Sequence, residues 1–305
     1  MLTVLSQAVL SGAAVGAIYA LLALGFSVTF STTKTLNFSH GEFVSTGAFI
    51  YVAALILSSG QTNLLVSGIQ AGAMQQAIAL VAALAIMAAL GALLYLVGVR
   101  PFVGKPGLAW VVSTIGFGIV LQSGVLALWG PGTVIVASPV GDGLVNVFGA
   151  VARRQELLVL GVAIVLVLLM DQLMRRTMLG RAMKAVAHNP AVASLMGINV
   201  TKVMIGSFAV SSALAALSGV LIAPIATASV YLGLAFGLKG FSAAIVGGLT
   251  NPRGCVIGGF LLGILEAMVN LWQAQWRDVV VFALVILVLV VRPTGLFGTR
   301  LVEKT

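Results

Sequence analysis

The chain is a succession of long apolar runs separated by short polar links. The runs cover about residues 6–30, 43–57, 75–99, 108–129, 156–174, 203–224, 233–250, 255–271 and 279–291. A helix needs roughly 20 residues to cross a bilayer core, so several runs fit, while 43–57 and 279–291 are short. The pattern predicts an all-α polytopic membrane protein with about eight to ten transmembrane or re-entrant helices in one bundle. We expect residues 1–305 to form a single transmembrane domain.

The composition agrees with a membrane protein. Hydrophobic residues make up 60% of the chain and charged residues 8%, with a mean hydropathy of +1.17. Soluble domains carry about 25% charged residues. The net charge of +9 is dispersed over the ends of apolar runs, where basic residues act as topology signals and lipid anchors. The basic balance therefore indicates contact with membrane lipids and excludes a nucleic-acid partner.

The basic residues give the expected orientation, because they are retained in the cytoplasm during membrane insertion. Nine crossings, with the N-terminus outside and the C-terminus inside, place most of them there together. These are Lys34, the 100–105 link, the 175–202 segment, Arg253, Arg292, Arg300 and Lys304. Arg153 and Arg154 are exceptions, since they fall in an expected external loop at about 131–155. Its Gly and Pro residues favour turns, and it is either an ordinary connection or a contact for an extracytoplasmic partner.

Residues 175–202, hereafter the basic segment, form a polar island between two apolar runs. Small and apolar residues alternate there with charged ones, and the pattern closes at Gly197. This alternation favours a short helix pair that docks on a cytoplasmic protein over a solvated linker. A membrane protein with such a segment is suited to being moved by a cytoplasmic partner.

A second polar cluster, residues 34–43, precedes the short run 43–57. In one interpretation it is a cytoplasmic turn, and Ser39 and Glu42 match a capping box that satisfies free backbone amides. In the other, a half-helix begins inside the membrane, and Asn37, Ser39 and His40 line a water-filled path. Irregular backbone at that depth requires a cavity or a protein cover. The residues alone leave both interpretations open.

Lys239 and Glu266 are isolated charges within apolar runs. Ionisable groups inside a membrane are costly, so each needs a partner or a function. Lys239 either extends its ammonium to the membrane surface or pairs with Glu266 or Glu42. We favour a structural ion pair over a substrate ligand. Arg277 and Asp278, beside two tryptophans, are expected to be anchors at the membrane boundary.

Glycine and cysteine positions add a packing prediction and no reaction chemistry. The GxxxG pairs Gly12/Gly16, Gly254/Gly258 and Gly259/Gly263 favour close internal helix packing over dimer formation. Cys255 is the single cysteine, and two distant histidines do not make a metal site. The chain contains no hydrolase or metalloprotease motif and no phosphate-binding loop. We therefore expect no enzyme, no bound metal and no cofactor in this chain.

Four blocks of the sequence resemble the LivH-type permease subunits of branched-chain amino-acid ABC importers. They are LNFSHGEFVSTGAF (36–49), GAIYALLALGFSVTF (16–30), LGRAMKAVAHNPAVASLMGIN (179–199) and LKGFSAAIVGGLTNPRGCVIGGFLLGILEAM (238–268). The resemblance implies a multi-pass protein of the bacterial inner membrane. It also implies a heterodimer with a LivM-like permease, two LivG/LivF-like ATPases that bind ATP and Mg²⁺, and a periplasmic substrate-binding protein.

The resemblance also suggests roles for particular residues. It implies that residues 180–199 are the loop that docks on the ATPase, with Gly180, Arg181, Lys184, Ala185, Ala193 and Gly197 as its coupling residues. His188 departs from the family pattern, which has an acidic or amide residue there. The polar positions expected along the substrate path are Asn37, Ser39, His40, Glu42, Lys239 and Glu266.

Three functions remain to be weighed. The leading hypothesis is a non-catalytic permease subunit for branched-chain or related amino acids. Relatives of the same family import urea, amides or aromatic acids, and those substrates are alternatives. An ion-coupled secondary transporter is a further alternative, for which Glu42 and Glu266 would be the buried acids.

Overall fold

The computed structural model describes residues 2–59, 72–103, 105, 107–141, 143–147 and 150–298. Arg300 and Lys304 lie outside the described residues, as do parts of the 100–105 link and of the 131–155 loop. The helices are α1 (Leu2–Thr33), α2 (His40–Ser59), α3 (Ala73–Leu94), α4 (Ala109–Trp129), α5 (Arg154–Arg176), α6 (Met178–His188), α7 (Pro190–Leu195), α8 (Val200–Ala226), α9 (Leu232–Gly247), α10 (Pro252–Trp272) and α11 (Arg277–Val291), with short turns η1 (Tyr95–Val99), η2 (Arg100–Phe102) and η3 (Ala274–Trp276).

Within these described residues, eight helices are long and apolar enough to cross a membrane, and α9 is a shorter apolar helix. The predicted all-α polytopic fold is confirmed. Helices α1 and α8 are the most buried, whereas α4, α5 and α11 expose most of their surface. A helix that is apolar all round, yet exposed, is typical of a surface that faces lipid. The core thus forms around α1 and α8.

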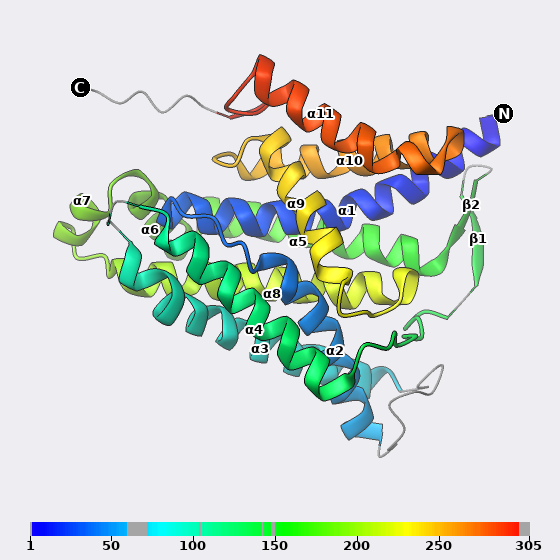
Figure 1. Ribbon diagram of the computed structural model, residues 1–305, viewed down its shortest axis with the longest axis horizontal. Coiled ribbons are helices and arrows are strands. Elements are labelled where there is room, and N and C mark those ends of the chain that lie inside the picture. The colour runs from blue at the N-terminus through cyan, green and yellow to red at the C-terminus, as the bar shows by residue number, and fades with distance from the viewer. Residues whose placement is uncertain are drawn as a thin grey trace.

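The two ends of the bundle differ in composition. Helix α1 begins at the end that carries the strands β1 (Leu144–Val147) and β2 (Ala150–Arg153), while α5 ends beside α6, at the opposite end of the bundle (Figure 1). Because α1 ends and α10 begins at this second end as well, Lys34 and Arg253 lie near the basic segment. The predicted clustering of these basic groups at one end is confirmed.

The 131–155 interval contains more regular structure than the expected loop. Strands β1 and β2 form an antiparallel hairpin in which Leu144 pairs with Arg153 and Val147 with Ala150. Both strands contain valine, and β2 alternates buried and exposed side chains, as a half-buried strand does. A further bridge joins Val134 to Ala228, in the link between α8 and α9. The hairpin therefore covers the end of the bundle opposite α6 and α7.

Glycines bring α1 and α10 into close contact. A Cβ on Gly12 would lie 2.7 Å from the Cβ of Ala267, and one on Gly16 would lie 3.0 Å from the carbonyl oxygen of Gly259. Gly254 and Gly258 pack in the same way against α9 at Gly247. Helices in lipid associate through close packing because burial from water no longer drives them together. The prediction of tight internal packing at the GxxxG pairs is confirmed.

This packing predicts that Gly259→Val destabilises the protein. The added Cβ would lie on the backbone of Ala20, and overpacking of this kind costs about 1–3 kcal/mol or more. The measurement is the melting temperature of the detergent-solubilised protein. Gly161→Val is the matched control, because Gly161 is exposed and a Cβ there meets nothing within 4 Å. Equal melting temperatures for the two variants would show that the glycine contact is dispensable.

Candidate functional site

Helix α2 begins inside the bundle, not at its end. The ring of His40 lies so close to Gly25 of α1 that a Cβ on Gly25 would be 2.7 Å from its Cε1 atom. Gly25 precedes the end of α1 at Thr33 by eight residues, which is about 12 Å along the helix. Residues 34–39 therefore fold back along α1 before α2 starts. The geometry favours the half-helix interpretation of the 34–43 cluster over the surface turn.

The polar side chains at this helix start are buried within protein. Asn37, Ser39 and His40 have no exposed surface. The Asn37 Oδ1 atom accepts hydrogen bonds from the Ser39 hydroxyl at 2.6 Å and from the Ser39 amide at 3.1 Å. Ser211 of α8 lies 3.3 Å from the His40 Nδ1 atom. These residues support the irregular backbone, and none of them lines the cavity between α1, α5, α6 and α10.

The predicted capping box is wrong. The Ser39 hydroxyl donates to Asn37, while the Glu42 carboxylate accepts a long bond of 3.4 Å from Ser45. Asn37 instead forms an Asx turn just before α2, because its side-chain oxygen accepts from the Ser39 amide two residues on. The two motifs share polar residues at similar spacing, which is why the sequence suggested the wrong one.

Two further helices cover the start of α2 through glycines. A Cβ on Gly41 would lie 2.5 Å from the carbonyl oxygen of Gly233 in α9, and Gly237 packs against Gly41 one turn on. On another side, α4 presents Gly118, where a Cβ would be 3.2 Å from the Ser39 Cβ and 3.4 Å from the Glu42 Cγ. Helices α2 and α9 therefore cross at their first turns, deep in the bundle.

Lys239 of α9 forms the predicted ion pair with Glu266 of α10. Its Nζ atom lies 2.7 Å from Glu266 Oε1 and 2.8 Å from Asp278 Oδ1. Arg277 contacts the same Glu266 oxygen at 3.2 Å, and Tyr19 of α1 donates to the other at 2.7 Å. Two cations and two carboxylates thus offset one another. Arg277 and Asp278 are more than boundary anchors, because their exposed side chains contact the buried Lys239–Glu266 pair, in a cluster that joins α1, α9, α10 and α11.

The basic segment folds into the predicted helix pair, α6 and α7. Three polar side chains mark the helix starts. Thr177 accepts from the Gly180 amide at 3.1 Å, Asn189 from the Val192 amide at 3.1 Å, and Asn199 from the Lys202 amide at 3.0 Å. Such N-caps fix where each helix begins. Gly197, with φ of +82°, ends α7 in a conformation that favours glycine.

The six expected coupling residues divide into a supporting set and a surface set. Gly180 and Ala193 are buried and Ala185 is half-buried, whereas Arg181, Lys184 and Gly197 are exposed. A Cβ on Gly180 would clash with Leu173, so Gly180 lets α6 fold tightly against the end of α5. Gly180 and Ala193 therefore shape the helix pair from within.

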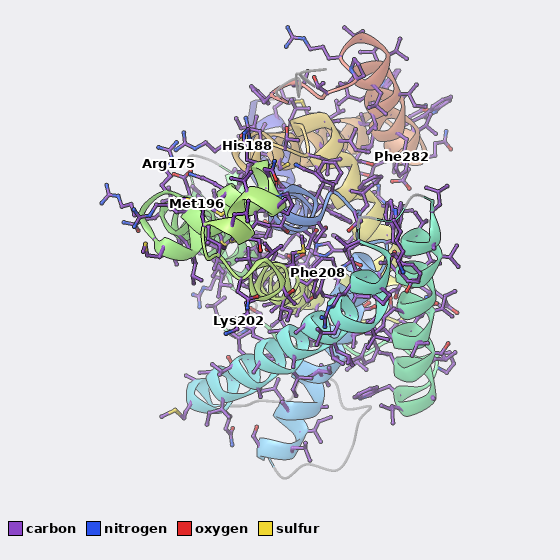
Figure 2. The ribbon with its side chains drawn as sticks, turned by 90° about the vertical axis from the view of Figure 1, so that its left-hand side faces the viewer. Arg175, His188, Met196, Lys202, Phe208 and Phe282 are labelled. Atoms are coloured by element: carbon purple, nitrogen blue, oxygen red, sulfur yellow. The ribbon has the colours of Figure 1, made fainter. Side chains whose placement is uncertain are left out.

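The exposed face of α6 and α7 also carries large apolar residues that the sequence did not indicate as contacts. Leu195 and Met196 are 87% and 77% exposed, and Leu179 and Val192 are more than half exposed. Figure 2 looks at this end of the molecule and shows His188, Met196 and Lys202 around it. Apolar side chains at this exposure, rimmed by basic ones, are typical of a protein interaction surface. This α7 surface comprises Val192, Leu195 and Met196.

Comparison with known proteins identifies similar chains over nearly the whole length. Residues 8–289 match the family described as the permease component of branched-chain amino acid transport systems. The chain is 34% identical over 304 residues to the high-affinity branched-chain amino acid transport system permease protein LivH of Escherichia coli (strain K12), which covers 98% of this chain and 97% of the relative.

More distant relatives carry similar names. The permease protein BraD of Pseudomonas aeruginosa, of the same kind of transport system, is 31% identical over 310 residues, covering 98% of this chain and 97% of the relative. A probable branched-chain amino acid transport permease protein LivH of Methanocaldococcus jannaschii is 25% identical over 295 residues, or 91% of this chain and 88% of the relative. No solved structure matches the chain.

The buried charge cluster predicts that Lys239→Met lowers stability substantially. Removing one partner of a buried ion pair costs about 3–5 kcal/mol, and we expect the lower end because Arg277 still contacts Glu266. The double variant Lys239→Met/Glu266→Met should lose less than the sum of the single variants, because no charge is left unpaired. Thermal unfolding in detergent measures each difference.

Asp278→Asn is the control for this series. The Asp278 side chain is 58% exposed, so its contact with Lys239 is screened by water and worth at most about 1 kcal/mol. A loss for Asp278→Asn as large as that for Lys239→Met would contradict the central role of the Lys239–Glu266 pair.

Proposed function

The chain belongs to the family of permease components of branched-chain amino acid transport systems, and from that premise we propose that it forms the substrate path of an importer for branched-chain amino acids together with a sister permease. It is a transport subunit of an ABC importer and not an enzyme. Its location is the bacterial inner membrane, which it crosses several times.

The α7 surface carries this proposal, because a transport subunit without a nucleotide site must receive its energy from another protein. Leu195 and Met196 are the most exposed apolar side chains at this end of α7, and the basic residues Arg181 and Lys184 lie on the adjoining α6. We assign this surface as the docking site of an ATPase subunit. The partners we propose are two LivG/LivF-like ATPases, which bind the ATP and Mg²⁺.

Helix α8 links the docking surface to the half-helix. It begins immediately after α7, packs against both α6 and α7, and reaches His40 through Ser211. Farther along, Gly219 lies against the backbone of Val44 in α2. A displacement of α6 and α7 by ATP-driven closure would therefore move α2 through a stiff helix. Alternating exposure of the substrate to the two sides of the membrane would follow.

The substrate path is proposed to run beside the crossing of α2 and α9. Next to the buried Asn37, Ser39 and His40, the aromatic ring of Phe38 is 44% exposed, and Leu234 and Leu238 of α9 are about half exposed. A LivM-like sister permease would complete the path along this face. In this structure Asn37, Ser39 and His40 are covered by protein, and the proposed movement of α2 would uncover them.

The proposed substrates are branched-chain amino acids delivered by a periplasmic binding protein. The names of the relatives LivH and BraD refer to branched-chain amino acid transport. Apolar residues at the path face suit an aliphatic side chain, and a zwitterion carries no net charge to be neutralised. The ion-coupled alternative is less well supported, since Glu266 is already paired with Lys239.

The docking proposal predicts that Leu195→Asp abolishes coupling without unfolding the protein. Because Leu195 is 87% exposed, the variant should be produced and melt like the parent chain. A buried carboxylate at an apolar interface is strongly unfavourable, so recovery of the ATPases with the tagged permease should fall at least about tenfold. Leucine uptake should fall to background. Leu195→Met is the conservative control and should retain both properties. Full recovery of the ATPases with Leu195→Asp would refute the assigned docking site.

The substrate proposal predicts saturable uptake of labelled leucine by cells that produce the complete transporter. Excess isoleucine or valine should reduce that uptake to background, whereas excess urea or an aromatic acid should not. A strain that lacks this permease gives the background level of leucine uptake. If only urea or the aromatic acid competes, the proposed substrate class is wrong. The role of the chain as a transport subunit would still hold.

A further inference from the structure

A cavity lies away from the α2–α9 crossing, between α1, α5, α6 and the start of α10. Its volume is about 380 Å³, within the range of about 300–1,000 Å³ usual for ligand pockets. Arg253 of α10 donates two hydrogen bonds to Asp171 of α5, at 2.8 and 2.9 Å, and this ion pair spans the cavity mouth. The ion pair thereby joins α5 to α10.

The mouth of this cavity is strongly cationic. Lys34, Arg175, Lys184 and Arg253 line it together with one carboxylate, Asp171. Both arginines already pair with that carboxylate. Neither lysine has an ion pair within the described residues. Partial burial lowers the pKa of Lys34, so an anion beside it would stabilise its charged form.

The other end of the cavity is apolar. Leu24 and Val28 of α1, Val167 of α5 and Val256 of α10 line it. Leu24 precedes Lys34 by ten residues, which corresponds to about 15 Å along a helix. The cavity therefore changes from apolar to cationic along its length. Leu168 and Ile257, which follow the lining residues Val167 and Val256, are exposed apolar side chains on the same two helices.

We propose that this cavity binds an anionic glycerophospholipid, with its phosphate among Lys34, Lys184 and Arg253 and an acyl chain along Leu24, Val28 and Val167. Basic pockets between membrane helices on the cytoplasmic side are suited to anionic headgroups. The inference rests on the proposed function only in that the function places this end of the bundle in the cytoplasm. Because Lys184 and His188 belong to α6, the lipid would contact the helix pair that receives the ATPase.

The test is native mass spectrometry of the purified permease complex after removal of co-purified lipid. Phosphatidylglycerol and phosphatidylcholine with identical acyl chains are added in separate titrations. We expect phosphatidylglycerol to bind about tenfold more tightly, because each cation near an anionic headgroup adds affinity. Equal retention of the two lipids would overturn the proposal, since the headgroup charge would then not be recognised.

Two variants locate the site. Lys34→Gln/Lys184→Gln should remove the preference for phosphatidylglycerol. Arg176→Gln/Lys202→Gln is the control, because it removes the same charge from exposed positions at the same end that do not line the cavity. Val256→Phe keeps every charge but fills the apolar part, and it should weaken retention as well. Unchanged preference in the lysine variant, or equal loss in the control, would place the lipid elsewhere and refute the site.

A further titration distinguishes binding of a lipid from binding of a soluble anion. Inorganic phosphate is added to the complex in place of lipid, and then in competition with phosphatidylglycerol. Displacement of the lipid at equal concentration would show that the acyl chain is not recognised, and would overturn the lipid assignment. Recovery of the ATPases is recorded in the same preparations. Failure of lipid binding with intact ATPase recovery would therefore refute only this inference.

Discussion

The structure depends on covering a helix start that lies inside the bundle. Residues 34–39 are not helical, and backbone polar groups that no helix satisfies need a protein cover wherever lipid surrounds the bundle. Asn37 supplies part of the solution by accepting from the Ser39 amide. The rest comes from four helices that close around the segment. Three of them, α1, α4 and α9, present glycine at the contact, and α8 presents Ser211. A side chain at any of those glycines would hold its helix away and expose the polar backbone.

Much of the fold follows from the sequence because lipid imposes a simple pattern. The apolar runs predicted most of the membrane helices, and the isolated charge of Lys239 predicted an ion pair with Glu266 or Glu42, because a charge in apolar surroundings needs a partner. The structure pairs it with Glu266. The participation of Asp278 and Arg277 was not predictable in the same way. Charges beside Trp272 and Trp276 also fit a membrane boundary, and the contact with Lys239 depends on how η3 turns α11 back onto α10.

The misjudged elements share a physical reason. The capping box and the Asx turn use overlapping residues, so the choice between them depended on how far Asn37 could reach. In α7, which has six residues, no periodicity shows which face packs on α6, and Leu195 could equally have been buried. The hairpin was missed because the short valine-containing strands lie in an interval whose Gly and Pro residues indicated turns. In each case tertiary contacts decided between local structures of similar stability.

The charge cluster of Lys239, Glu266, Arg277 and Asp278 also constrains how the chain is made. A single charge such as Lys239 within a membrane helix disfavours insertion by up to about 2.5–3.5 kcal/mol, whereas the assembled cluster is nearly neutral. Lys239 and Glu266 are 27 residues apart in the chain. Helix α9 therefore reaches the membrane before α10, which carries the counter-charge Glu266, has been synthesised far enough to insert beside it. Helices α9 and α10 therefore have reason to leave the insertion machinery together, as a hairpin, with α11 added before the pair is released into lipid.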